Sequence, residues 1–323
     1  MRRGWRTRKV RTSRGTFDIR LAQVSCRQCQ RVFRPYALRL GLPSARRFLA
    51  EVEEKMIHLA TQLPYARAQD ILSRLNGIQV SPKTIRQRIL LKAEEERAQP
   101  ILRKVSHSLV DSTKVRAGEK SGGEHVHMAI SVERGPLLHG RPTLKKTLLD
   151  LSLGGARKLK EVLSRLHPER LVHDGFLDLS ECAEKVQRCR WHLPYEIRMF
   201  LHYDGLKWRY TVPLATELRE ILWCKTPSAY DQFALELRSQ GFRRSAKHLE
   251  NARKEIFTYR GDPGFRFTTT SPLEREMREL NRRMDVGARW SLQGAESMLW
   301  VLFRRRFQHR NQILKEQERP PPG

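Results

Sequence analysis

Two aspartates stand where carboxylates can support metal chemistry. Asp111 follows the apolar pair Leu109-Val110, and Asp174 follows Leu171-Val172 and one histidine. Both are expected at the ends of strands, where carboxylates of one sheet can converge and hold Mg²⁺ or Mn²⁺, which prefer oxygen ligands. Two such ions about 3.5–4 Å apart can stabilise the attacking and leaving oxygens of a phosphodiester displacement. A generic Asp-Gly turn and a generic strand exit remain open as alternatives.

A third carboxylate comes from a predicted helix near the C-terminus. Glu274 lies beside an apolar stripe on this helix, so it is expected to point back towards the sheet, whereas Glu276 is expected to face away. The alternative is a capping box, in which Glu274 would only bond the backbone N–H of Ser271. The stripe consists of Leu273, Met277, Leu280 and Met284.

A Cys-x-x-Cys pair near the N-terminus has the spacing of half a zinc ribbon. Cys26 and Cys29 follow the alternating, β-like run Thr16–Leu21. Tetrahedral Zn²⁺ needs four nitrogen or sulfur ligands, and the nearest further candidate, His58, falls in a predicted helix. The alternatives are a partial zinc site and a pair of reduced thiols in a small β-module.

Residues 43–98 have helical spacing and contain a basic helix. One helix is expected after Leu63-Pro64-Tyr65, a turn at Asn76-Gly77, and a second helix from Ser81-Pro82, a typical N-cap and first-turn pair. This layout is typical of a helix-turn-helix, although ordinary helical hairpins share it. The basic side chains of the second helix are expected to bind DNA phosphates first. They are Lys83, Arg86 and Arg88.

The elements that must position the two aspartates alternate between strand-like and helical patterns. Such a mixture predicts an α/β or mixed sheet. Strands are expected at 105–115, 125–132, 148–153, 171–172 and near 189–192, and helices at 156–166 and 177–186.

Residues 196–264 are expected to be mainly helical and are rich in Arg, Lys and aromatic residues. Arg243, Arg244 and Lys247 cluster there. Basic and aromatic side chains together suit unpaired or distorted DNA, because bases can stack on the rings. A solvated basic face over an aromatic core is the alternative. The expected helices are 214–223, 230–240 and 245–257.

The composition identifies a polyanion as the partner. The 323 residues include 63 Lys and Arg against 35 Asp and Glu, a formal net charge of +28. The longest apolar runs, such as Met298–Phe303, are far below the roughly 20 residues that span a bilayer, so we expect nucleic acid rather than a membrane. Five unevenly placed cysteines predict a reducing, cytoplasmic compartment.

These textures divide the chain into six expected segments. A basic β-module with the partial zinc-ribbon pattern precedes a helical DNA-binding domain, and the two parts of a catalytic core enclose an all-helical insertion. The boundaries are 1–42, 43–104, 105–195, 196–264 and 265–305, followed by a basic, proline-ending tail at 306–323.

Several motifs in the catalytic region resemble those of mutator-type bacterial transposases. Val186–His192 is similar to the "Q-R-C-x-x-H" element that this family places between its second aspartate and a helical insertion. Thr270–Glu274 is similar to "T-N-x-x-E" at the family's catalytic glutamate, with Ser271 in place of the usual asparagine. Arg283-Met284 and Arg289–Ala295 resemble the "R-M" and "R-W-S-x-x-G-A" that close the catalytic domain in a related branch of insertion-sequence transposases.

The N-terminal region resembles the same branch. Val24–Cys29 and Leu40–Pro43 match "V-x-C-x-x-C" followed by "L-G-L-P", while Pro64-Tyr65 and Val80–Ile85 approximate "P-Y" and "V-S-x-x-T-I". The chain lacks the upstream half of the zinc ribbon. The resemblance covers almost the whole chain in the family's order.

The resemblance implies an RNase H-like core with a DDE triad of Asp111, Asp174 and Glu274. These residues would bind two Mg²⁺ or Mn²⁺ ions, with Asp111 bridging them, while Zn²⁺ at Cys26 and Cys29 stays open. Cys189, His192 and Trp290 are implied as accessory residues.

The implied activity is Mg²⁺-dependent cleavage and strand transfer at the ends of a bacterial insertion sequence. The implied partners are double-stranded transposon ends and target DNA, bound by a homo-oligomer associated with the nucleoid. Two alternatives stay open. One is a catalytically inactive, transposase-derived DNA-binding protein, and the other is a related metal-dependent nuclease that cuts DNA without joining ends.

Overall fold

The computed structural model describes residues 2–40, 42, 48–99, 104–119, 121–286 and 289–317. The chain forms two compact units, Met1–Gln99 and Pro100–Gly323. Parts of two sequence-based expectations lie outside the described residues. These parts are Gly41 and Pro43 of the Leu-Gly-Leu-Pro motif and residues 318–323 of the expected tail.

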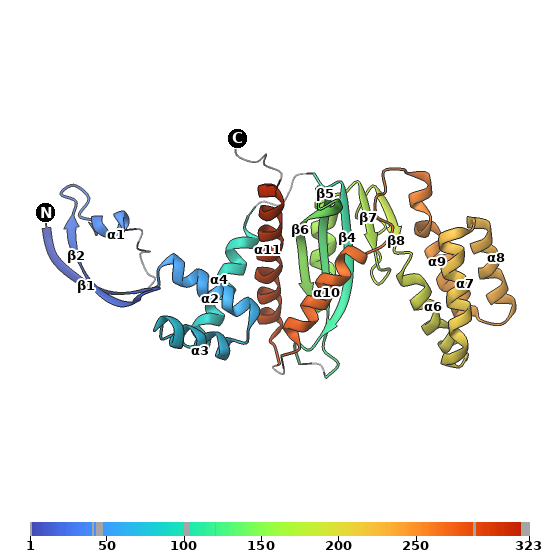
Figure 1. Ribbon diagram of the computed structural model, residues 1–323, viewed down its shortest axis with the longest axis horizontal. Coiled ribbons are helices and arrows are strands. Elements are labelled where there is room, and N and C mark those ends of the chain that lie inside the picture. Colours follow the sequence, from blue (N-terminus) through green and yellow to red (C-terminus); the bar gives the residue numbers. More distant parts are fainter. Residues whose placement is uncertain are drawn as a thin grey trace. The chain divides into compact units, whose positions relative to one another are not determined.

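A basic β-hairpin opens the N-terminal unit (Figure 1). Strand β1 (Arg2–Thr12) pairs antiparallel with β2 (Gly15–Ser25), which pairs with the short β3 (Val32–Phe33). The short helix α1 (Pro35–Arg39) packs against β2. A small apolar core holds these elements together because one face of the hairpin is buried. Its buried members are Val10, Leu21, Ala37 and Leu42.

Three helices complete this unit: α2 (Ala50–Gln62), α3 (Tyr65–Asn76) and α4 (Pro82–Arg97). Helix α3 ends at Gly77, whose φ of 62° is the left-handed conformation that glycine adopts without strain. Helix α4 begins as its sequence predicts, because the Ser81 hydroxyl accepts a hydrogen bond from the Thr84 amide at 3.2 Å. The two expected helices and the glycine turn between them are therefore present.

The C-terminal unit contains a mixed five-stranded sheet in the order β6-β5-β4-β7-β8. Strands β4, β5 and β6 form an antiparallel meander, and β7 and β8 extend the sheet in parallel with β4. The predicted α/β class is confirmed at this level. The strands are β4 (His107–Val115), β5 (Glu124–Leu138), β6 (Arg141–Leu153), β7 (Arg170–His173) and β8 (Lys185–Arg188).

Helices cover both faces of this sheet (Figure 1). Helix α5 (Arg157–Leu166) buries Leu159 and Leu163 against one face. Helices α10 (Ser271–Met284) and α11 (Leu292–Gln317) contact strands β4 and β6 from the other side. We had expected a separate tail from residue 306. Because α11 continues to Gln317, residues 306–317 are instead part of a packed helix.

A helical subdomain follows the sheet and has its own core. Its core contains the buried Tyr230, whose hydroxyl donates to the Leu249 carbonyl at 2.8 Å. The predicted all-helical segment is confirmed, but it begins earlier than residue 196. Its helices are α6 (His192–Tyr203), α7 (Thr211–Cys224), α8 (Pro227–Ser239) and α9 (Arg243–Ile256), with 3₁₀ turns at Trp208–Tyr210 and Thr258–Gly261.

Two local predictions in the sheet region are wrong. Residues 177–184 form turns instead of a helix, because Asp178 accepts hydrogen bonds from the Ser180 amide and hydroxyl and so stabilises a competing turn. Their apolar residues are buried all the same, which explains the misleading helical spacing. The strand expected near 189–192 is β8, which ends at Arg188. In the described part of the chain, no helix is long and apolar enough to cross a membrane.

Candidate active site

The sheet places Asp111 beside Asp174. Strands β4 and β7 are parallel neighbours whose last paired residues are Val110 and His173. The next residue along the chain is Asp111 in β4 and Asp174 directly after β7, so both aspartates lie side by side at this edge of the paired region. We had expected Asp111 to end its strand, and this expectation is wrong. Strand β4 continues to Val115, with β5 alone as its partner beyond Val110.

Backbone amides orient both aspartates. The Ser112 amide donates to Asp111 Oδ1 at 2.9 Å, and the Phe176 amide donates to Asp174 Oδ1 at 2.9 Å. The turn between Asp174 and Phe176 depends on Gly175. Its φ is +90°, and a Cβ there would collide with the Arg188 guanidinium.

Helix α10 presents Glu274 from its first turn. The segment that leads into the helix is fixed to the end of β8, since the Arg190 amide donates to the Thr268 carbonyl at 3.1 Å and the Thr270 amide donates to Cys189 Sγ at 3.3 Å. The capping-box alternative is wrong. The N-cap is Thr270, without a side-chain cap bond, and Ser271 is already inside the helix.

Glu276 does not face away from the protein, and that expectation is also wrong. Its carboxylate is 1% exposed and accepts hydrogen bonds from Lys146 Nζ and Arg306 Nε, each at 2.8 Å. Lys146 belongs to β6 and Arg306 to α11. The apolar stripe predicted one buried face, but contacts with both the sheet and α11 bury a wider arc of the helix.

The carboxylates influence one another electrostatically. Burial, together with the negative charges of Asp174 and Glu274, raises the pKa of Asp111 to about 7, although the charge of His192 and the Ser112 amide oppose this shift. Asp111 is only 4% exposed. The structure thus brings the three predicted carboxylates, from β4, β7 and α10, into one electrostatic cluster.

Cys189 and His192 lie at the edge of this cluster. Burial alone would lower the pKa of His192, but the hydrogen bond and charge of Cys189, together with Asp111 and Asp174, raise it to about 9. The Thr270 hydroxyl lies 3.3 Å from His192 Nδ1. An imidazolium therefore stands beside the carboxylates at neutral pH. The sequence had named both residues as accessory, and the structure places them at the site.

Trp290, the third candidate for an accessory residue, is buried in packing contacts away from the carboxylates. Its indole is 9% exposed and donates from Nε1 to the Met284 carbonyl at 3.3 Å, at the far end of α10 from Glu274. The Arg283 guanidinium lies over its ring at 4.9 Å. These contacts hold Trp290 against the last turn of α10.

The candidate DNA-contacting residues differ in exposure. Lys83 and Arg86 on α4 are exposed, but Arg88 is turned inwards, with its guanidinium 3.5 Å from Glu53 and near the Phe48 ring. At the start of α9 the basic residues are exposed, and Asp204 accepts from the Arg244 and Ser245 amides and caps that helix. The exposed residues of this α9 group are Arg243, Arg244 and Lys247.

The two N-terminal cysteines lie together on the turn after β2. The backbone and thiol of Cys29 and the Gln28 amide hydrogen bond to Cys26 and lower the pKa of its thiol. That is the arrangement of half a zinc knuckle. Within the described residues no third ligand joins them.

A cluster of aromatic rings that was not predicted from the sequence lies beside Asp174. The Phe176 ring stacks on His125 with centroids 4.6 Å apart and lies 5.7 Å from the ring of His127. His127 Nδ1 is 3.0 Å from the Ser112 hydroxyl, next to Asp111. Burial lowers the pKa of His127, while Asp174 opposes that shift. The alternation His-Val-His in the predicted strand was the signal that placed both histidines on one face.

The donor atoms at the carboxylate cluster suit a hard divalent cation. All three are carboxylates, and the raised pKa of Asp111 shows that its charge is poorly compensated by the protein. Across the described residues, no three His, Cys, Asp or Glu side chains already lie at ligand spacing. Asp111, Asp174 and Glu274 are nevertheless the residues that could hold such an ion. No protein-family model and no curated protein matches the chain.

Proposed function

We propose that this protein is a transposase of a bacterial insertion sequence with an RNase H-like catalytic core. The observation that carries the proposal is that β4, β7 and α10 bring three carboxylates within electrostatic reach of one another, with Asp111 buried and repelled by the other two. A titratable group perturbed by burial and like charges is typical of a catalytic site.

The sheet and the helical segment support the proposal. Three antiparallel strands extended by two parallel ones, with helices on both faces, accommodate an RNase H-like core. The helical subdomain lies between the second aspartate and the glutamate, where the transposase resemblance implies an insertion. The helix pair α3–α4 suits a helix-turn-helix, with Lys83 and Arg86 on its exposed side.

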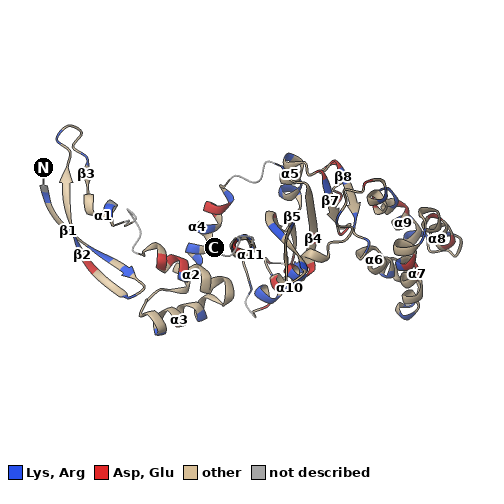
Figure 2. Ribbon diagram, turned by 45° about the horizontal axis from the view of Figure 1, so that its top comes forward, with Lys and Arg blue, Asp and Glu red and all other residues tan. Residues whose placement is uncertain are grey.

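The charge supports DNA as the substrate. A net charge of +28 suits a partner with closely spaced phosphates, and Lys and Arg occur on elements of both units (Figure 2). Affinity for DNA should therefore fall steeply as the salt concentration rises. A protein that binds both a transposon end and a target DNA needs more phosphate contacts than a protein that binds one short DNA site.

The residues of the site divide the chemistry among them. Asp111, Asp174 and Glu274 would hold Mg²⁺ or Mn²⁺, which when bound would activate the attacking oxygen and stabilise the leaving oxygen. The His192 imidazolium would hold a non-bridging oxygen of the phosphate beside the carboxylates. In cleavage, a water oxygen forms a bond to phosphorus as the bond to the DNA 3′-oxygen breaks, and that oxygen takes up a proton. In joining, the oxygen of the new 3′-OH loses its proton and forms a bond to a target phosphorus as the bond from that phosphorus to the target strand's own 3′-oxygen breaks. The released target 3′-oxygen takes up a proton.

Strand cleavage and strand joining test the proposal directly. The substrate is DNA that carries the gene with its flanking sequence, incubated with Mg²⁺ or with EDTA. We expect metal-dependent cleavage at the flanks and joining to target DNA, both lost in Asp174→Asn. Cleavage without joining would identify a nuclease, and DNA binding without metal-dependent cleavage would identify an inactive, transposase-derived DNA-binding protein.

A further inference from the structure

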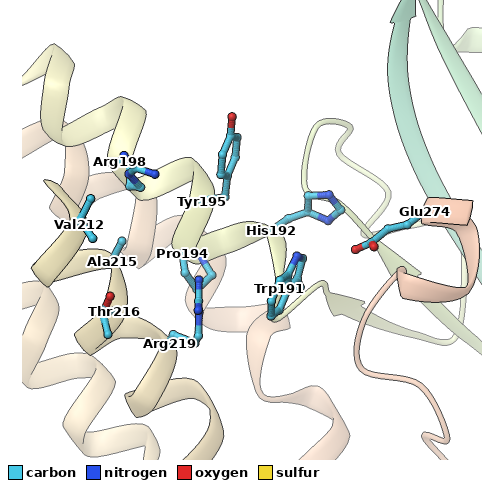
Figure 3. A pocket seen from close by; sticks show the side chains of 10 residues that line it. All are labelled: Trp191, His192, Pro194, Tyr195, Arg198, Val212, Ala215, Thr216, Arg219 and Glu274. Atoms are coloured by element: carbon cyan, nitrogen blue, oxygen red, sulfur yellow. The ribbon is translucent and has the colours of Figure 1, made fainter. Parts of the chain in front are cut away.

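A cavity of about 340 Å³ lies between helices α6 and α7, and Glu274 and His192 close one end of it (Figure 3). It therefore adjoins the carboxylate cluster. Most of its lining comes from the helical subdomain, which the proposed chemistry does not otherwise use. Besides Glu274 and His192, the lining includes Trp191, Tyr195, Arg198, Val212, Thr216 and Arg219.

Large aromatic rings at the cavity are exposed. Trp191 is 48% exposed and Tyr195 is 61% exposed. The Arg219 guanidinium lies over the Trp191 ring at 5.0 Å. Indole and guanidinium planes together form a surface on which another flat ring can stack.

The charged groups that line the cavity indicate what the flat ring is attached to. The lining contains the guanidinium groups of Arg198 and Arg219 and one carboxylate, Glu274. Glu274 lies at the end where a metal-bound phosphate would lie. Val212 and the buried Pro194 and Ala215 supply an apolar wall. A flat heteroaromatic ring attached to an anionic backbone satisfies both parts of the lining.

We propose that this cavity, the Trp191 cavity, binds an unpaired nucleobase of the DNA strand whose phosphate lies at Asp111, Asp174 and Glu274. The inference rests on the proposed function for the position of that phosphate. A base inside a duplex is covered on both faces by its neighbours, so only an unpaired or extruded base can stack on Trp191. Stacking would offset the cost of extrusion and hold the adjoining phosphate in place.

The test measures DNA affinity in EDTA, so that cleavage plays no part. The probes are a duplex with one unpaired thymidine, the same duplex with an abasic unpaired nucleotide, and the fully paired duplex. We expect the wild type to bind the thymidine bulge about 5- to 150-fold more tightly than the abasic bulge, the usual range for stacking of one base. Trp191→Ala should remove this preference, Trp191→Phe should keep most of it, and affinity for paired DNA should be unchanged.

A matched control and a second variant keep the test decisive. Trp223 is 42% exposed and has the Arg190 guanidinium 4.1 Å from its ring centre, but it does not line the cavity. Trp223→Ala should therefore keep the base preference. Thr216→Trp, at an exposed position on α7, should fill the cavity and abolish the preference without removing a buried side chain.

Two results would overturn the inference. One is equal affinity of the wild type for the thymidine and abasic bulges. The other is a loss of affinity in Trp191→Ala that is the same for paired and unpaired DNA, which would indicate phosphate contact only. A retained base preference in a protein without metal-dependent cleavage would count against the proposed function and not against the base site.

Discussion

Two glutamates of helix α10, Glu274 and Glu276, lie two residues apart along the chain but belong to clusters of opposite character. In the first, which we call the structural cluster, cations from β6 and α11 (Lys146 and Arg306) contact the buried carboxylate of Glu276. In the second, which we call the carboxylate cluster, Glu274 lies near two further carboxylates and one imidazolium. The first cluster connects three elements through matched charge, whereas the second leaves negative charge poorly compensated.

The difference separates stability from function. Buried charge is costly unless it is paired, so a cluster retained only for stability is expected to be balanced like that of Glu276. Three carboxylates held together with Asp111 buried oppose folding and suit a site that receives a cation. Substitutions in the two clusters should therefore have opposite effects on stability and activity.

The largest effect on stability is expected at the structural cluster. The Lys146 side chain is 5% exposed, and Lys146→Met would leave the buried Glu276 with Arg306 alone. Breaking a buried pair in this way costs about 3–5 kcal/mol, measured as the free energy of unfolding in denaturant. The double variant Lys146→Met/Glu276→Met should recover much of the loss. A Lys146→Met protein as stable as the wild type would contradict the assigned role of the cluster.

At the carboxylate cluster, Asp111→Asn should stabilise the protein while it abolishes activity. Because burial raises the folded-state pKa of Asp111 from 3.8 to about 7, the folded protein holds a proton that the unfolded chain has released between these values. The free energy of unfolding should therefore fall as pH rises from about 4 to about 7. The difference of about 3 pH units corresponds to at most about 4 kcal/mol at pH 8. Thermal unfolding at pH 5 and pH 8 measures this, and a destabilised Asp111→Asn at pH 8 would contradict it.

A divalent cation should produce the smallest of these effects. Saturating Mn²⁺ at pH 8 should raise the free energy of unfolding by roughly 1–3 kcal/mol, as expected for a ligand that binds only the folded state. The effect should weaken below pH 7, because protonation of Asp111 competes with the cation. Glu274→Gln should reduce it and Glu276→Gln should not. Equal Mn²⁺ stabilisation in both variants would place the cation elsewhere.

The sequence was informative where local rules decide the structure. Ser81-Pro82 predicted the start of α4, and the apolar runs predicted the strands that bring Asp111 and Asp174 together. It failed where contacts between distant segments decide. The burial of Glu276 depends on Lys146, 130 residues earlier, and on Arg306 from α11. The apolar spacing at 177–186 reflects a buried loop and the start of β8, which periodicity cannot distinguish from a helix.

The Trp191 cavity could not be predicted from the sequence, because contacts between distant segments form it. Trp191, Arg219 and Glu274 come from three segments that the helical subdomain folds together. A count of basic and aromatic residues indicated unpaired DNA as a partner but not which rings would meet a base. The position of the cavity beside Glu274 is a property of the tertiary structure alone.

The most direct test compares the two glutamates in one cleavage assay. Wild type, Glu274→Gln and Glu276→Gln are incubated with Mn²⁺ and DNA carrying the gene and its flanks, after thermal unfolding has been measured for each. Glu274→Gln should lose cleavage by on the order of 10³-fold or more without loss of stability, whereas Glu276→Gln should be less stable yet cleave below its unfolding temperature. Full cleavage by Glu274→Gln, or loss of cleavage only in a folded Glu276→Gln, would contradict the assignment of the carboxylate cluster as the active site.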